Sequence, residues 1–80
     1  MITEKKLLEI ISRTVGKKVS IKSKSSQFEK WDSLGQLQIL SKLDKATKGK
    51  TSNLITLTEA KSVKDIKKIL IKSKLLKDKI

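Results

Sequence analysis

Apolar residues recur at helical spacing in three segments of this chain, and the first segment covers residues 4–15. Its apolar stripe consists of Leu7, Leu8, Ile11 and Val15, with Ile10 at the margin. Thr3 fits the N-cap position, and Gly16 is the expected end because glycine readily takes the left-handed conformation that closes a helix. The pattern predicts a first helix over residues 4–15.

Leucine recurs every three residues in the second segment, residues 33–48. The apolar face expected for this helix comprises Leu34, Leu37, Ile39, Leu40, Leu43 and Ala46. Gly49 is its expected end. This segment has the strongest helical pattern in the chain.

The third helical segment begins after Ser62. Ser62-Val63-Lys64-Asp65 fits a capping box, in which the serine and the aspartate each accept a backbone hydrogen bond at the helix start. The apolar positions that follow are Val63, Ile66, Ile69 and Leu70. The helix either continues through Leu75 and Leu76 or frays into a basic tail over residues 71–80.

Two connecting segments lack this regularity. Residues 17–31 are polar and rich in serine and lysine, and we expect a long ordered loop held to the core by Val19, Ile21, Phe28 and Trp31. Its serines are expected to be solvated, and Trp31 is expected to cover the core. In residues 50–61, Leu54, Ile55 and Leu57 are expected to contact the core, and residues 58–61 to form at most a short turn of helix.

Strand patterns are scarce, so the predicted fold class is all-α. The expected architecture is a small four-helix bundle of three longer helices and one short helix, with the long loop between the first two long helices. No internal repeat, proline or linker divides the 80 residues, which indicates one domain over residues 1–80 with a core of about residues 4–70.

The chain is strongly basic, with 20 Lys and Arg against 8 Asp and Glu and a net charge of +12. Residues 32–49 are nearly neutral by comparison, with three bases and two acids. Arg13 is the only arginine, whereas recognition of phosphates and bases tends to use arginine for its planar, bidentate guanidinium. The lysines therefore favour solubility over nucleic-acid binding as their role.

Several classes of chemistry are excluded by composition. Without Cys or His the chain has no disulfide, no thiol and no soft ligand for structural zinc, and no metal site is expected. No apolar run approaches the roughly 18 residues of a membrane span, and residues 1–6 lack the apolar core of a leader peptide. The expected location is the cytoplasm.

The candidate site is Ser33, which opens the second helix. A helix start carries unpaired backbone N–H groups and a partial positive charge, so a phosphate on this side chain would be stabilised. The alternative is structural: Ser33 and Gln36 have the spacing of a capping box. Asp32 is an equally good N-cap that could free the Ser33 hydroxyl, and Gly35 would make room beside it.

The chain resembles an acyl carrier protein in three successive features. They are Trp31-Asp32-Ser33-Leu34-Gly35, the aliphatic helix through Ala46, and Leu57-Thr58-Glu59-Ala60-Lys61-Ser62-Val63 leading into the last helix. The resemblance runs from Leu7 to about Leu70. The Asp-Ser-Leu tripeptide alone is a weak motif, and its position between these helices makes it more specific.

The resemblance implies that a separate phosphopantetheinyl transferase attaches 4′-phosphopantetheine to Ser33, and that the thiol of this arm holds an acyl or aminoacyl group as a thioester. The protein would itself catalyse nothing and would act as a monomer. The residues expected to dock partner enzymes are Asp32, Leu34, Gln38, Ser41, Lys42 and Lys45. Candidates for sheltering an acyl chain are Leu37, Leu40 and Leu57, although their helical spacing favours an ordinary core role.

The charge departs from the family, whose members are typically acidic along this helix. Here its expected exposed positions include Gln36, Gln38, Lys42, Lys45 and Lys48, and Asp44 is the only acid. Charge complementarity governs encounter and partner choice, so we expect acyl-loading and acyl-processing partners with less positive or acidic docking surfaces. This favours a specialised lipid, polyketide or secondary-metabolite pathway over general fatty acid synthesis.

Two other functions stay open. A basic helical module could bind nucleic acid or an anionic membrane through Lys17, Lys18, Lys22 and Lys24 in the loop and Lys64, Lys67, Lys68, Lys72, Lys74, Lys77 and Lys79 near the C-terminus. The near absence of aromatic residues that could stack on bases counts against this function. A carrier fold that is never loaded could also serve as an interaction protein.

Overall fold

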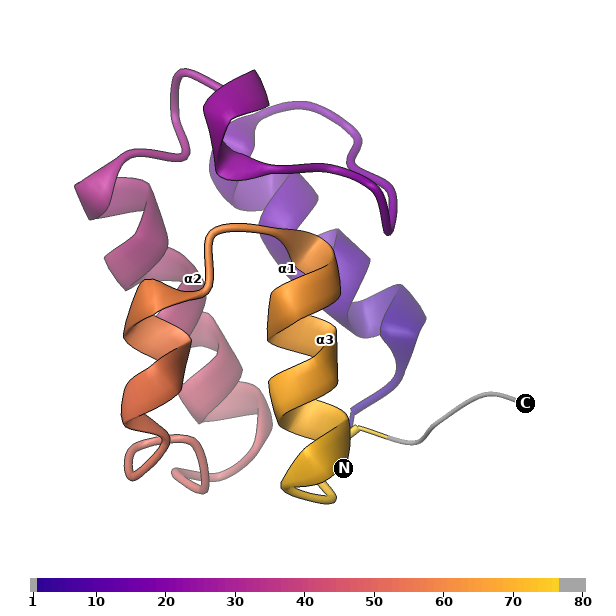
Figure 1. Ribbon diagram of the computed structural model, residues 1–80, viewed down its shortest axis with the longest axis vertical. Helices are drawn as coiled ribbons and strands as arrows, with labels where there is room; N and C mark the ends of the chain where they lie inside the picture. The colour runs from indigo at the N-terminus through magenta and orange to yellow at the C-terminus, as the bar shows by residue number, and fades with distance from the viewer. Residues whose placement is uncertain (1, 77–80) are drawn as a thin grey trace.

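A computed structural model describes residues 2–76, and their regular structure is helical (Figure 1). The three α-helices are α1 (Glu4–Val15), α2 (Ser33–Ala46) and α3 (Val63–Lys72). Two short 3-10 helices, η1 (Ser25–Gln27) and η2 (Ile55–Glu59), lie in the connections. Residues 2–76 form no strand beyond two isolated bridges, which confirms the all-α prediction. The predicted four-helix bundle is not confirmed, because these residues hold three α-helices and the short element before α3 is a 3-10 helix.

Helix α1 has the predicted bounds and caps. The Thr3 side chain accepts a hydrogen bond from the Lys6 backbone at 3.1 Å, and Gly16 closes the helix at a φ of 76°. Leu7 and Ile11 are fully buried, and α1 packs against both α2 and α3. This helix forms because a four-residue apolar spacing gives it one continuous inward face.

The loop between α1 and α2 is docked along its length, as predicted. Val19 and Trp31 are buried, while Ile21 and Phe28 are half-buried against the core. The loop also pairs with the start of α3 and the segment before it, because Ser23 O accepts from Val63 N at 3.0 Å and Lys61 O accepts from Ser25 N at 2.7 Å. Ser23 is itself buried, so the prediction of a solvated serine stretch is wrong at this position.

Helix α2 exposes two residues of its predicted apolar face, since Leu34 and Leu37 are 63% and 64% exposed. Three residues fall about 60° short of a full helical turn, so side chains at a strict three-residue spacing do not share one face. Each successive leucine lies farther around the helix. Ile39 and Leu43 are buried as expected. The helix ends at Ala46 instead of residue 48, and Gly49 follows at a φ of 84°.

The connection from α2 to α3 holds η2 beside both helices, as Figure 1 shows in orange. Leu57 and Ala60 are buried, and Leu54 is half-buried. Ile55 is 79% exposed, so its predicted core contact is wrong. The short helix begins at Ile55, three residues before the predicted turn, because Leu57 anchors it from the middle.

Helix α3 begins as predicted, with the Ser62 side chain accepting from Asp65 N at 3.1 Å. The reciprocal half of the capping box, from Ser62 N to the Asp65 carboxylate, does not form within the described chain. The helix neither continues nor frays after Lys72, because Leu75 and Leu76 fold back into the core and Ile2 N donates to Leu75 O at 2.8 Å. Residues 77–80 of the predicted extension lie outside the described residues.

Candidate functional site

Ser33 is the first residue of α2, and its side chain is exposed. Asp32 is the N-cap instead. Its carboxylate accepts from Gly35 N at 2.9 Å, and its carbonyl accepts from Gln36 N at 2.8 Å. The Ser33 hydroxyl consequently has no hydrogen-bond partner among residues 2–76, and it is available for chemistry.

Gln36 takes no part in capping and faces the interior, which contradicts both the capping-box alternative and its predicted exposure. Its side-chain oxygen accepts from the Trp31 indole N–H at 2.6 Å. Its side-chain nitrogen donates to Leu57 O at 3.0 Å and to Ala60 O at 2.8 Å. One buried amide therefore joins the end of the loop, the first turn of α2 and η2.

Gly35 is also buried, and its lack of a side chain lets the backbone of the preceding loop approach α2 closely. A Cβ at this position would clash with the backbone carbonyl oxygen of Lys30. The expectation that Gly35 makes room beside Ser33 is therefore wrong, because the loop occupies that space. This close approach, together with the Gln36 bonds, holds the start of α2 in one position and so fixes the direction of Ser33.

The electrostatic setting of Ser33 has two opposing parts. The backbone N–H groups of Ser33 and Leu34 have no partner in the described part of the chain, as is usual for a first helical turn. These groups and the helix dipole favour a phosphate on the Ser33 side chain. The neighbouring Asp32 carboxylate opposes it, although that carboxylate is partly satisfied by Gly35 N.

The predicted docking residues all lie on the exposed side of α2. They are Asp32, Leu34, Gln38, Ser41, Lys42 and Lys45. The Lys42 ammonium turns toward α1, where it donates to the Thr14 hydroxyl at 3.2 Å. Lys42 and Lys45 also line a groove together with residues of α1, so they border α1 as well as the outward face of α2.

The three acyl-chain candidates do not share one environment. Leu57 is buried in the core and Leu40 is half-buried against it, as the ordinary core role requires. Leu37 is mostly exposed, so neither a core role nor an enclosed pocket describes it here. The structure assigns Leu37 to the outward surface of α2, along with Leu34.

A groove between α1 and α2, of about 320 Å³, was not predicted from the sequence. Ile10 and Ala46 contribute its apolar part. Its charged side chains are Lys6, Glu9, Arg13, Lys42 and Lys45. Lys6, Glu9 and Arg13 recur every three or four residues along α1, and this spacing is the one indication in the sequence that they share a face.

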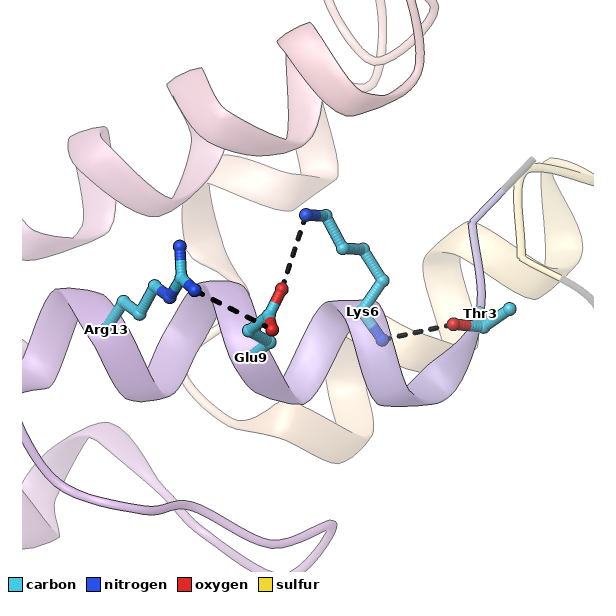
Figure 2. A network of polar contacts seen from close by, with 4 residues as sticks. All are labelled: Thr3, Lys6, Glu9 and Arg13. Carbon is cyan, nitrogen blue, oxygen red and sulfur yellow. Dashed lines mark hydrogen bonds and ion pairs between the residues drawn. The ribbon is translucent and has the colours of Figure 1, made fainter.

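Figure 2 shows Glu9 between the other two charged residues of this face. The Glu9 carboxylate pairs with the Lys6 ammonium at 3.3 Å and with the Arg13 guanidinium at 3.8 Å. All three side chains are substantially exposed. Because exposed ion pairs contribute little to stability, this network orients charge and adds little to folding.

The lysines of the nucleic-acid or membrane alternative are mostly exposed. The exposed ones are Lys17, Lys18, Lys22, Lys24, Lys64, Lys68, Lys72 and Lys74. Lys67 is half-buried in an ion pair with Glu4, and residues 77 and 79 lie outside the described chain. Trp31 is buried, and Phe28 is half-buried at 6.4 Å from it between ring centroids, so residues 2–76 offer one partly covered ring and no extended surface for stacking.

Residues 2–76 contain no group of three or more acidic side chains that could hold a metal ion. They also contain no helix with the length and apolar character that crossing a bilayer requires. Comparison of the chain with models of protein families, with curated proteins and with solved structures finds no match.

Proposed function

We propose that this chain is an acyl carrier protein that holds its cargo on a 4′-phosphopantetheine arm at Ser33. The observation that carries the proposal is the state of the Ser33 hydroxyl. It is exposed at the start of a 14-residue helix and accepts or donates no hydrogen bond within residues 2–76, because Asp32 caps the helix in its place. A serine with a purely capping role would have its hydroxyl bonded to the first turn.

The proposed modification is a transfer from coenzyme A by a separate transferase. The Ser33 oxygen forms a phosphodiester with the phosphopantetheine, its proton is lost, and the adenosine bisphosphate part of coenzyme A leaves. The arm supplies the thiol that a chain without Cys cannot supply itself. The unpaired N–H groups of the first turn stabilise the added phosphate, and the protein contributes presentation instead of catalysis.

The outward side of α2 is the proposed docking surface for partner enzymes. Leu34 and Leu37 offer apolar contact close to the arm, while Lys42 and Lys45 offer positive charge farther along the helix. In this proposal η2 takes the place of the short third helix of a carrier. Partners should present neutral or acidic surfaces, act on the carrier in the cytoplasm, and belong to a specialised lipid or secondary-metabolite pathway.

Mass spectrometry of the intact protein tests the proposal directly. The unmodified protein is incubated with coenzyme A and a broad-specificity phosphopantetheinyl transferase, next to a control carrier that this enzyme loads. We expect a mass gain of one phosphopantetheine in the wild type and none in Ser33→Ala. Ser41→Ala, which removes another exposed hydroxyl of α2, should still be loaded.

Two results would contradict the proposal. The first is no mass gain under conditions that fully load the control carrier, which would favour an interaction protein that is never loaded. The second is an equal mass gain in Ser33→Ala, which would place the modification at another residue.

A further inference from the structure

We propose that the groove between α1 and α2 binds an acidic amphipathic helix of a partner protein. Among residues 2–76, the groove is lined by the cations Lys6, Arg13, Lys42 and Lys45 and by one acid, Glu9. The side chains come from two helices, and Figure 2 shows the α1 pair on the side of that helix on which α2 lies. Opposite charges across such a surface steer encounter and select the partner.

The spacing of the α1 cations suits a helical ligand. Lys6 and Arg13 are two helical turns apart, or about 10.5 Å along α1. In a ligand helix that lies in the groove, two carboxylates two turns apart have the same separation as Lys6 and Arg13 and can pair with them. Its intervening apolar residues would then lie over Ile10 and Ala46, which provide the apolar part of the groove.

The same features disfavour a nucleic acid as the occupant. A phosphate backbone has no apolar group to cover the middle of the groove, and no aromatic residue of residues 2–76 lines the groove for base stacking. Glu9 adds a negative charge between Lys6 and Arg13, which penalises a continuous line of phosphates more than two separated carboxylates.

The groove is separate from the proposed attachment residue. Lys42 follows Ser33 by about 14 Å along the axis of α2, and Ser33 is not among the residues that line the groove. The inference extends the proposed docking surface to α1 and names its occupant. Because its test uses the unmodified protein, its outcome is independent of whether Ser33 is loaded.

The test measures the affinity of a fluorescent helical peptide of about fifteen residues by anisotropy. The peptide carries two glutamates about two turns apart with leucines between them. A peptide of the same composition, with its glutamates on opposite faces, and a short DNA duplex serve as comparison ligands. We expect the designed peptide to bind the wild type most tightly of the three.

Two matched double variants separate the groove from general charge. Lys42→Glu with Lys45→Glu changes the groove, while Lys64→Glu with Lys68→Glu makes the same charge change on exposed positions of α3. The groove variant should weaken the Kd about tenfold, and the α3 variant no more than about twofold. Circular dichroism should show that both keep their helices.

Glu9→Gln should change peptide affinity in the opposite direction. A folding defect would weaken binding and so cannot produce this result. Removal of its negative charge should tighten peptide binding about threefold, the size expected for an exposed charge. Equal losses in the two double variants would overturn the proposal, as would equal binding of the rearranged peptide or tighter binding of the DNA.

Discussion

Helices α1 and α2 are similar in length, at 12 and 14 residues, but they are held in the fold by different interactions. The inward face of α1 is almost entirely apolar, with Leu7 and Ile11 fully buried. The first turn of α2 instead buries Gly35 and Gln36 and leaves Leu34 exposed.

This difference separates two physical ways of placing a helix. Apolar burial is non-directional and scales with area, so α1 is held strongly with little constraint on any single atom. Hydrogen bonds and a close backbone approach are directional, so the start of α2 is held in one orientation. The candidate site lies at the start of α2, where these directional contacts fix the orientation, and Leu34 and Leu37 lie exposed on the same helix.

The largest expected change in the free energy of unfolding comes from truncating a core residue of α1, and truncating an exposed apolar residue of α2 is its control. Ile11→Ala should lower the free energy of unfolding by about 3 kcal/mol, because it leaves a cavity in a fully buried position. Leu37→Ala should change it by no more than about 0.5 kcal/mol, because that side chain is 64% exposed. Urea unfolding followed by circular dichroism measures both. A large loss in Leu37→Ala would mean that α2 buries this face after all.

An intermediate effect tests the polar placement of α2. Gln36→Ala should cost about 2–3 kcal/mol, because it leaves the Trp31 indole N–H and the Ala60 carbonyl buried without their partner, whereas Leu57 O keeps its bond from Ala60 N. Gln38→Ala, on the exposed side of the same helix, should be nearly neutral. Unfolding followed by fluorescence of Trp31 reports on the network directly. Equal stability of the two variants would show that burial alone holds α2.

The smallest expected effect assigns the cap. Asp32→Ala should cost about 1 kcal/mol through loss of the bond to Gly35 N, as for other N-caps. Ser33→Ala should cost less than about 0.5 kcal/mol, because the Ser33 hydroxyl is exposed and unbonded. Thermal unfolding of both variants gives the comparison. A larger loss in Ser33→Ala would make serine the cap and would remove the main support for its modification.

Local patterns of the sequence determined the helices and several of their ends. A polar N-cap and a left-handed glycine act within a few residues, so Thr3, Gly16 and Ser62 were sufficient to predict the ends at which they lie. The anchors of the long loop were also predictable, because large apolar residues in a polar segment have few alternatives to the core. The local pattern also predicted Ser33 as a candidate site, because it places this residue at the start of a helix.

Only the tertiary structure decided which side of α2 faces inward. Gln36 and Ser33 have the spacing of a capping box, and nothing local distinguishes that arrangement from the one observed. The choice depends on Trp31, on the carbonyls of Leu57 and Ala60, and on Lys30, which fills the space that Gly35 leaves open. Most of these groups are many residues from α2 in sequence or belong to a loop without periodicity. Their contacts arise only when the whole chain packs, so the freedom of the Ser33 hydroxyl is a property of the fold.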